Sequence, residues 1–360
     1  MVVLKFEKKE NHVRRIHTTA SLTAFLLLCV ALSQHSFAAA AWPALPDLTA
    51  FLMLSTEAGK PQSLISIEKA ADGLKAYDVI LFGEFHDHAG NHLAEMQFFR
   101  ALYAREPKLA LSMEQFERDV QPIVDAYMAG KIGEEPFRSR ARAWANYAES
   151  YRPLVEYAKE RRLPVIAAEI PTALVRCVGQ DGPDYLARLS PEKRRWAAAE
   201  LHLDTIAYRD KFFRFLQESG SHGLEEGPFD AAGKPTDDAL RAFASQASRD
   251  DTMAESIFLY LQKNPGRKVL HITGAFHVER FLGTAERLKL RAPNLKIAVI
   301  NPVQVDDPEH PTLAARDEGG GNFTLLLRAT PKEYANDAEK KAAEEKIRSR
   351  IGTSRGNCAS

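Results

Sequence analysis

The chain has 360 residues, of which 45% are hydrophobic and 27% are charged, and its 48 basic residues balance its 48 acidic residues. This is the composition of a globular protein, and without a basic excess a nucleic-acid partner is not expected. The length allows one large domain or two smaller ones.

Residues 1–40 have the pattern of a secretory signal peptide. Basic residues precede the apolar run SLTAFLLLCVALS at 21–33, and small residues follow it, with the simplest cleavage site after Ala40. The apolar run is shorter than the ~20 residues that a membrane-spanning helix needs. We therefore expect an exported protein, periplasmic or associated with an outer membrane.

Three cysteines bear on this expectation. Cys29 lies inside the apolar run, and Leu28 precedes it where a lipoprotein signal has a small residue, so membrane contact is expected only if the chain is lipidated. Cys177 and Cys358 can pair in an oxidising compartment. Because Cys358 lies in a polar tail, the sequence favours two unpaired cysteines.

Short apolar runs bounded by polar turns recur from residue 78 onward. Most are continuous rather than alternating, which is typical of strands covered on both faces. A helical pattern at 92–106 separates the first two, as in a βαβ unit. The fold class that we predict is α/β, with a mostly parallel sheet flanked by helices. The predicted strands are 78–82, 109–113, 163–168, 268–273, 296–300 and 323–327.

The middle of the chain breaks this alternation. Residues 115–160 and 185–263 have helical patterns without a clear strand, which indicates a smaller helical-bundle insertion. The tail at 331–360 is charged and contains few apolar residues, so we expect a solvated appendage. The predicted organisation is a signal peptide at 1–40, an α/β domain with its insertion at 41–330, and the tail.

Polar side chains follow the predicted strands. Two strands end in the same Gly-x-x-His spacing, at Gly83–His86 and Gly274–His277, and others end in Glu114 and Glu169. The carboxyl ends of parallel strands lie at one edge of the sheet, where ligands of open α/β folds bind. A glycine in such a turn allows close approach of the backbone to a ligand. We therefore expect these residues to converge in one polar site.

Imidazoles and carboxylates in one site suit a divalent metal such as Zn, Mn, Fe or Co. The candidate ligands are His86, His277, Glu84, Glu114 and Glu169. The simpler interpretation of each acid is a helix cap. Asp87 is expected to cap the helix that begins near Gly90. His88 and His92 are four positions apart on that helix, a spacing that permits metal binding but more often indicates an exposed face. His271 is expected to be a core histidine.

Trp144, Tyr147 and Tyr151 have the spacing of one helical face. Core packing is the usual role of such a face. The alternative is an apolar wall with phenol oxygens that suits a planar cofactor, since tyrosinate can be an axial ligand of haem iron. No CxxCH motif for covalent haem attachment is present.

With these residues in view, the chain resembles the ChaN-like family of haem-binding iron-uptake proteins, within the Tiki/TraB/erythromycin-esterase superfamily. The resemblance runs from about Tyr77 to Thr330. It rests on the order of the two Gly-x-x-His turns and the intervening Glu114. The segments that carry it include ILFGEFHDHAGNH, LALSMEQFERDVQPIVDAYMAGKI, NYAESYRPLVEYAKERRLPVIAAEIP, RDDTMAES and LHITGAFHVERFLG.

The resemblance implies an α/β domain that binds haem through a tyrosine, with two subunits stacking haems at a homodimer interface. It implies Tyr151 as the first candidate ligand and Tyr147 as the second, with Trp144, Gly83 and Gly274 also in the haem site. Relatives in the superfamily imply an alternative, a metal-dependent peptidase or esterase. Its candidate catalytic residues are Glu84, His86, Glu114 and His277.

Overall fold

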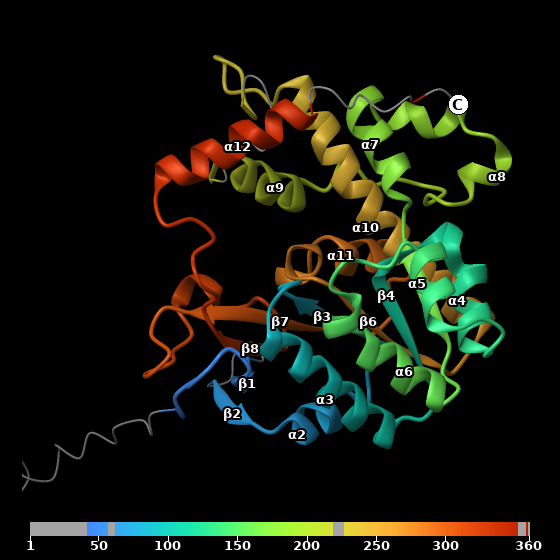
Figure 1. The fold of residues 1–360 in the computed structure, drawn as a ribbon, viewed down its shortest axis with the longest axis vertical. Helices are drawn as coiled ribbons and strands as arrows, with labels where there is room; N and C mark the ends of the chain where they lie inside the picture. The colour runs from blue at the N-terminus through green and yellow to red at the C-terminus, as the bar shows by residue number, and fades with distance from the viewer. Residues whose placement is uncertain (1–41, 57–61, 219–226, 352–357, 359–360) are drawn as a thin grey trace, which may run out of the picture. The chain divides into compact units, whose positions relative to one another are not determined.

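The computed structural model describes residues 42–56, 62–218, 227–351 and 358, so the expected signal peptide lies outside the described residues. Eight strands form a sheet in the order β2-β1-β8-β7-β3-β6-β4-β5 (Figure 1). They are β1 (Phe51–Ser55), β2 (Ser63–Ile65), β3 (Val79–Glu84), β4 (Leu109–Glu117), β5 (Val165–Glu169), β6 (Lys268–Gly274), β7 (Ile297–Val305) and β8 (Phe323–Arg328).

All pairs from β8 to β5 are parallel, whereas β1 runs antiparallel to both β2 and β8. The predicted fold class, a mostly parallel sheet flanked by helices, is confirmed. The six predicted strands correspond to β3–β8. The sequence did not predict the short antiparallel pair β1 and β2.

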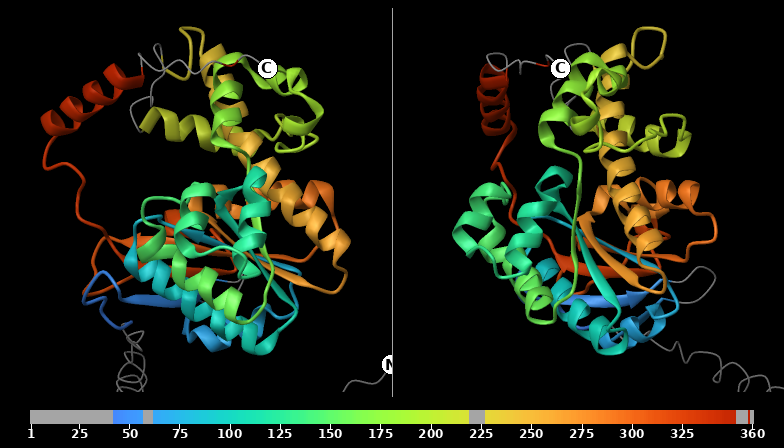
Figure 2. Two further views of the ribbon diagram at one scale, coloured as in Figure 1. Left: turned by 45° about the vertical axis from the view of Figure 1, so that its right-hand side comes forward. Right: turned by 90° about the vertical axis from the view of Figure 1, so that its right-hand side faces the viewer.

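Helices cover both faces of the sheet (Figure 2). The side chains of Ile80 and Phe82 pack with α2, α3 and α6, and those of Val79 and Leu81 pack with α10 and α11. Alternate residues of a strand point to opposite faces, so a strand covered on both faces is apolar throughout. These helices are α2 (Ile67–Leu74), α3 (Ala89–Arg105), α6 (Arg152–Glu160), α10 (Asp237–Lys263) and α11 (Thr284–Arg291).

The remaining helices lie mostly in the ranges expected to be helical. They are α4 (Gln121–Met128), α5 (Glu134–Arg140), a π-helix (Tyr147–Tyr151), α7 (Thr172–Asp181), α8 (Pro191–Arg194), α9 (Ile206–Glu218) and the tail helix α12 (Asp337–Ile351). Short 3-10 turns occupy Arg118–Val120, Pro183–Arg188, Ala275–His277, Glu279–Phe281 and Ala315–Asp317. No helix among the described residues is both long enough and apolar enough to cross a membrane.

Helix α3 begins differently from the expectation. His88, not Asp87, is its N-cap, because the His88 Nδ1 accepts a hydrogen bond from the backbone N–H of Asn91 at 3.3 Å. Its Nε2 bonds to the carbonyl oxygen of Arg328 at 2.8 Å, which fixes the ring. His88 and His92 are both buried, so their expected placement on an exposed face is also wrong. His271 is a core histidine as expected, bonded to Ser112.

The cysteines correct another expectation. Cys177 and Cys358 form a disulfide, so the favoured interpretation of two unpaired cysteines is wrong. Cys177 lies on α7 and is 6% exposed, and Cys358 packs against the apolar cluster around it. The polar composition of the tail therefore did not prevent Cys358 from reaching α7.

The disulfide joins residues 181 positions apart. Cross-linking so long a loop restricts the unfolded chain, so reduction is expected to lower the free energy of unfolding by up to about 5 kcal/mol. Urea denaturation with and without a reductant measures the difference. Cys358→Ser removes the link with little packing change, whereas Cys177→Ser also places a hydroxyl in the apolar cluster. Equal stability of the oxidised wild type and Cys358→Ser would contradict the expectation.

Candidate functional site

The two Gly-x-x-His turns lie on neighbouring strands. In the parallel register of β3 and β6, Glu84 is opposite Gly274. The His86 ring crosses to β6 and lies against Gly274, where a Cβ atom would be 3.0 Å from its Nε2. A side chain at position 274 would therefore displace His86. This contact explains why the second turn begins with glycine.

Gly83 has a different role from Gly274. A Cβ atom there would lie 3.0 Å from Pro302 Cδ and 3.1 Å from both Ala275 and Val278. The absence of a side chain thus lets the second turn and β7 pack directly on β3. Gly83 supports the site from behind, and Gly274 borders it.

Glu84 is the centre of the first group of polar residues. Its Oε1 accepts hydrogen bonds from Tyr151 Oη at 2.9 Å and Gln115 Nε2 at 2.7 Å, and it lies 2.8 Å from His86 Nδ1. Burial, with the nearby charge of Glu95, raises the pKa of Glu84 to about 7. Burial alone would lower the pKa of His86, but its bond to Glu84 and the negative charges of Glu114 and Glu84 together outweigh burial and raise it.

Glu114 is the centre of the second group. It accepts hydrogen bonds from Thr273 Oγ1 at 2.5 Å, from the backbone N–H of Gly274 at 2.7 Å and from Arg249 Nη2 at 2.8 Å. Burial would raise the pKa of Glu114, but the positive charges of His277 and Arg249 hold it well below its usual range. Glu114 is therefore a carboxylate at neutral pH.

His277 links this group to helix α10. Its Nδ1 lies 2.9 Å from Asp250 Oδ1, and its Nε2 lies 3.8 Å from Glu114 Oε1. Burial would lower the pKa of His277, but the two carboxylates outweigh burial and raise it. A buried imidazole held at one nitrogen by a carboxylate is suited to proton transfer at the other.

The residues that were expected to converge in one polar site therefore form two groups, one around Glu84 and one around Glu114. Arg249 forms ion pairs with Glu114 and with Glu169, at 2.8 Å each, so a guanidinium already neutralises two of the expected metal ligands. Sequence reasoning missed Arg249 and Asp250, because they lie in the middle of a long helix with no local motif. The RDDTMAES segment contains both, but it served only as evidence of resemblance.

The three aromatic residues do not share one face. Trp144 precedes the π-helix at Tyr147–Tyr151, so the helical spacing does not extend to it, although its ring lies 5.8 Å from that of Tyr151. Tyr147 packs on Phe116 and Phe137 in the core, and Tyr151 is fully buried with its hydroxyl on Glu84. Trp144 lies at the cavity, with its ring 4.9 Å from the ring of His86.

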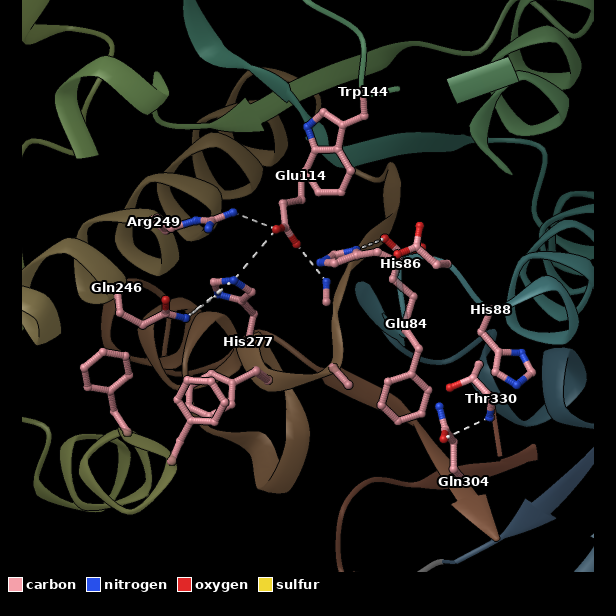
Figure 3. A pocket seen from close by; sticks show the side chains of 17 residues that line it. Glu84, His86, His88, Glu114, Trp144, Gln246, Arg249, His277, Gln304 and Thr330 are labelled. Carbon is pink, nitrogen blue, oxygen red and sulfur yellow. Dashed lines mark hydrogen bonds and ion pairs between the residues drawn. The ribbon is translucent and has the colours of Figure 1, made fainter. Parts of the chain in front are cut away.

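A cavity of about 760 Å³ lies over both groups at the carboxyl edge of the sheet (Figure 3). In Figure 3, Arg249 points to Glu114 and Gln246 points to His277. One wall is polar and contains the two histidines. The aromatic residues that line the cavity are Phe85, Trp144, Phe212, Phe215 and Phe276.

Two comparisons give distant relatives of the chain. "Protein RETICULATA-RELATED 5, chloroplastic" of Arabidopsis thaliana is 25% identical over 234 residues, which are 62% of this chain and 30% of that protein. The chain thus spans less than a third of that relative. A solved structure described as cofacial heme binding to ChaN of Campylobacter jejuni covers 78% of this chain and 97% of its own, with 17% identity and a TM-score of 0.58.

The ChaN likeness shows a shared fold. A structure of a mutant of the erythromycin esterase EreC in its open conformation is more distant, with 13% identity and a TM-score of 0.41. It covers 77% of this chain and 82% of its own, and its similarity is too low to support a conclusion about the chain. The family model described as "Haem-binding uptake, Tiki superfamily, ChaN" matches residues 70–288, more than half of the chain. The chain therefore belongs to this ChaN family of the Tiki superfamily.

Proposed function

We propose that the protein binds haem in the cavity at the carboxyl edge of the sheet. The observation that carries this proposal is the combination of an aromatic lining with the imidazole of His86 in a cavity of about 760 Å³. Sites for small molecules and cofactors have volumes of roughly 300–1,000 Å³ and mostly apolar walls. Membership in the ChaN family supports the same ligand.

A neighbouring cavity supports a ligand that bears carboxylates. It has a volume of about 480 Å³ and shares Phe215 and Phe276 with the first. Arg214 and Arg280 line it beside the acids Glu218, Glu279 and Asp317. Among the described residues no ion pair joins either arginine to a carboxylate. Arginine binds carboxylates through paired hydrogen bonds. A planar apolar ring in the first cavity can extend its propionates toward these arginines.

The proposal also concerns the axial ligand of the haem iron. The resemblance implies a tyrosine, but the phenol oxygen of Tyr151 is buried against Glu84 and that of Tyr147 lies in the core. Burial and the charge of Glu84 raise the pKa of Tyr151, which opposes formation of a tyrosinate. The side chain of His86 is 39% exposed at the cavity. We propose His86 as the axial ligand.

Export and assembly complete the proposal. We propose that the protein acts outside the cytoplasm, which the signal-like segment 1–40 and the disulfide support, because disulfides persist in oxidising compartments. The family resemblance implies a homodimer with haem at its interface. The molecular mass of the haem-free and haem-loaded protein in solution tests the dimer, and the N-terminus of the secreted protein tests export.

Titration with ferric haem, followed by its Soret absorbance, is expected to show saturable binding. His86→Ala should change the spectrum and weaken binding, because the axial imidazole is lost, whereas Tyr151→Phe should leave the spectrum unchanged. Haem dimethyl ester should bind at least about tenfold more weakly, since even one lost charge-assisted hydrogen bond costs about 1.5 kcal/mol or more. The double variant Arg214→Ala/Arg280→Ala should remove this preference.

The exposed His310 provides the matched control, because His310→Ala removes a surface imidazole that does not line the cavity. A charge-transfer spectrum of tyrosinate that disappears in Tyr151→Phe would overturn His86 as the ligand and establish the tyrosine implied by the resemblance. Unsaturable binding that no cavity variant alters would overturn the haem proposal.

A second candidate function is hydrolysis of an ester or peptide bond. The pair of Asp250 and His277 at the cavity wall favours it, because the aspartate orients the imidazole for proton transfer. The metal-dependent form expected from the sequence has weaker support, since Arg249 already neutralises Glu114 and Glu169. In the form that we propose, His277 exchanges a proton with the attacking water or the leaving group.

If the protein is a hydrolase, His277→Gln should lower the hydrolysis rate of nitrophenyl esters or peptides by about 10²–10⁴-fold. Asp250→Asn should lower the pKa of His277, because burial is then opposed by Glu114 alone, and should shift the pH profile to lower pH. Imidazole NMR and pH–rate profiles measure the two effects.

Asp307→Asn is the control, because Asp307 lies 3.1 Å from the exposed His310 and leaves His277 untouched. Equal rates in the wild type and His277→Gln would contradict a catalytic role for this histidine. The absence of hydrolysis by the wild type across both substrate classes would remove the second candidate function.

A further inference from the structure

Three acceptor atoms converge beneath the first Gly-x-x-His turn. They are Glu84 Oε2, Glu95 Oε2 and His92 Nδ1, and all lie within 4.8 Å of one another. His92 Nδ1 is 3.4 Å from the first oxygen and 3.1 Å from the second. The side chains are nearly inaccessible to solvent, with exposures of 2% for Glu84, 0% for Glu95 and 9% for His92.

The other atoms of these groups already have hydrogen-bond donors or acceptors. Glu84 Oε1 is held by the Tyr151, Gln115 and His86 side chains, and Glu95 Oε1 accepts a hydrogen bond from Asn91 Nδ2 at 2.8 Å. By contrast, Glu84 Oε2 is fully buried with no hydrogen-bond partner among the described residues. Both Oε1 atoms are thus fixed, and both Oε2 atoms turn toward His92.

The tautomer of His92 determines which of its ring nitrogens faces the two carboxylates. Its Nε2 lies 2.8 Å from the backbone carbonyl oxygen of His86, and a carbonyl can only accept, so Nε2 carries the ring proton. The Nδ1 of the neutral ring then presents a lone pair to two buried carboxylate oxygens. Three lone pairs in an apolar surrounding repel one another unless a proton or a metal cation lies between them.

We propose that Glu84, His92 and Glu95 bind a divalent transition-metal ion. One imidazole and two carboxylates suit Mn²⁺, Fe²⁺ or Zn²⁺. The hydrogen bonds from Asn91, Gln115 and Tyr151 to the outer carboxylate oxygens, and that from His92 to the His86 carbonyl, are the outer-shell contacts that orient metal ligands. Glu84 also borders the cavity, which gives the ion a route from solvent.

The ion would fix the position of His86. His92 bonds to the backbone of His86 and Glu84 bonds to its ring, so two of the contacts of this histidine come from the proposed metal ligands. The inference does not rest on haem binding or on hydrolysis. The role that it assigns to the metal is to order the first Gly-x-x-His turn.

The test uses the full, untagged chain, free of haem and treated with a chelator, and titrates it with Mn²⁺ and Zn²⁺. The wild type is expected to bind one equivalent, measured by elemental analysis after gel filtration, and its Tm should rise with metal concentration. Mn²⁺ bound to the protein also changes its electron paramagnetic resonance spectrum, which gives a readout independent of activity.

Glu95→Gln distinguishes a ligand from a residue that only supports packing. Without metal it should be about as stable as the wild type, because the amide oxygen of glutamine can still accept the hydrogen bond from Asn91 Nδ2. Its metal affinity should fall by more than about 100-fold, since even an outer-shell partner is worth about 10–100-fold. Glu169→Gln is the matched control, a buried strand-end glutamate whose partner is Arg249, and it should bind metal like the wild type.

Absence of stoichiometric metal and of a metal-dependent Tm in the wild type would overturn the proposal. An equal loss of metal binding in Glu95→Gln and Glu169→Gln would also overturn it, because the site would then lie elsewhere. His92→Gln gives an independent check if Glu95→Gln does not fold. Neither outcome depends on whether the cavity binds haem.

Discussion

The carboxylate of Glu84 is the interaction on which the rest of the site depends. At the end of β3, one of its oxygens joins a histidine of the next turn, a glutamine of β4 and a tyrosine of the π-helix. These donors come from segments that are up to 67 residues away. A buried carboxylate is stable only when such donors compensate for lost water. The compensation therefore also fixes the geometry of the first turn.

Helix α10 provides the second half of the arrangement. It packs along β5 and carries Arg249 and Asp250, which contact Glu114 within β4 and His277 in the turn that follows β6. Arg249 lies between the carboxylates of Glu169 and Glu114, and His277 lies between those of Glu114 and Asp250. Each buried charge in this row therefore has a partner of opposite sign. Such pairing is the condition under which charged groups remain buried and ionised. The cavity can be polar on this side because the helix supplies those partners.

The sequence predicted the part of this structure that local patterns encode. Continuous apolar runs followed by polar residues identified β3–β8 and placed Glu84, Glu114 and Glu169 at one edge, because parallel strands align their ends. The partners of these acids could not be predicted, since Arg249 is 135 residues from Glu114 and occupies an ordinary helical position. The aromatic face failed for a local reason, because Trp144 lies before the helix that holds Tyr147 and Tyr151, so the 3.6-residue period does not relate it to them.

The disulfide has a consequence for how the protein is handled. Cys358 is bonded to α7, and α7 packs against α10, the helix that carries Arg249 and Asp250. Material produced in a reducing cytoplasm will carry two thiols there, because thiols are kept reduced in that compartment. Its tail then lacks the covalent attachment next to the helix that completes the site. Preparations from the two compartments are therefore chemically different molecules, and ligand affinities measured on one do not transfer to the other without a thiol count.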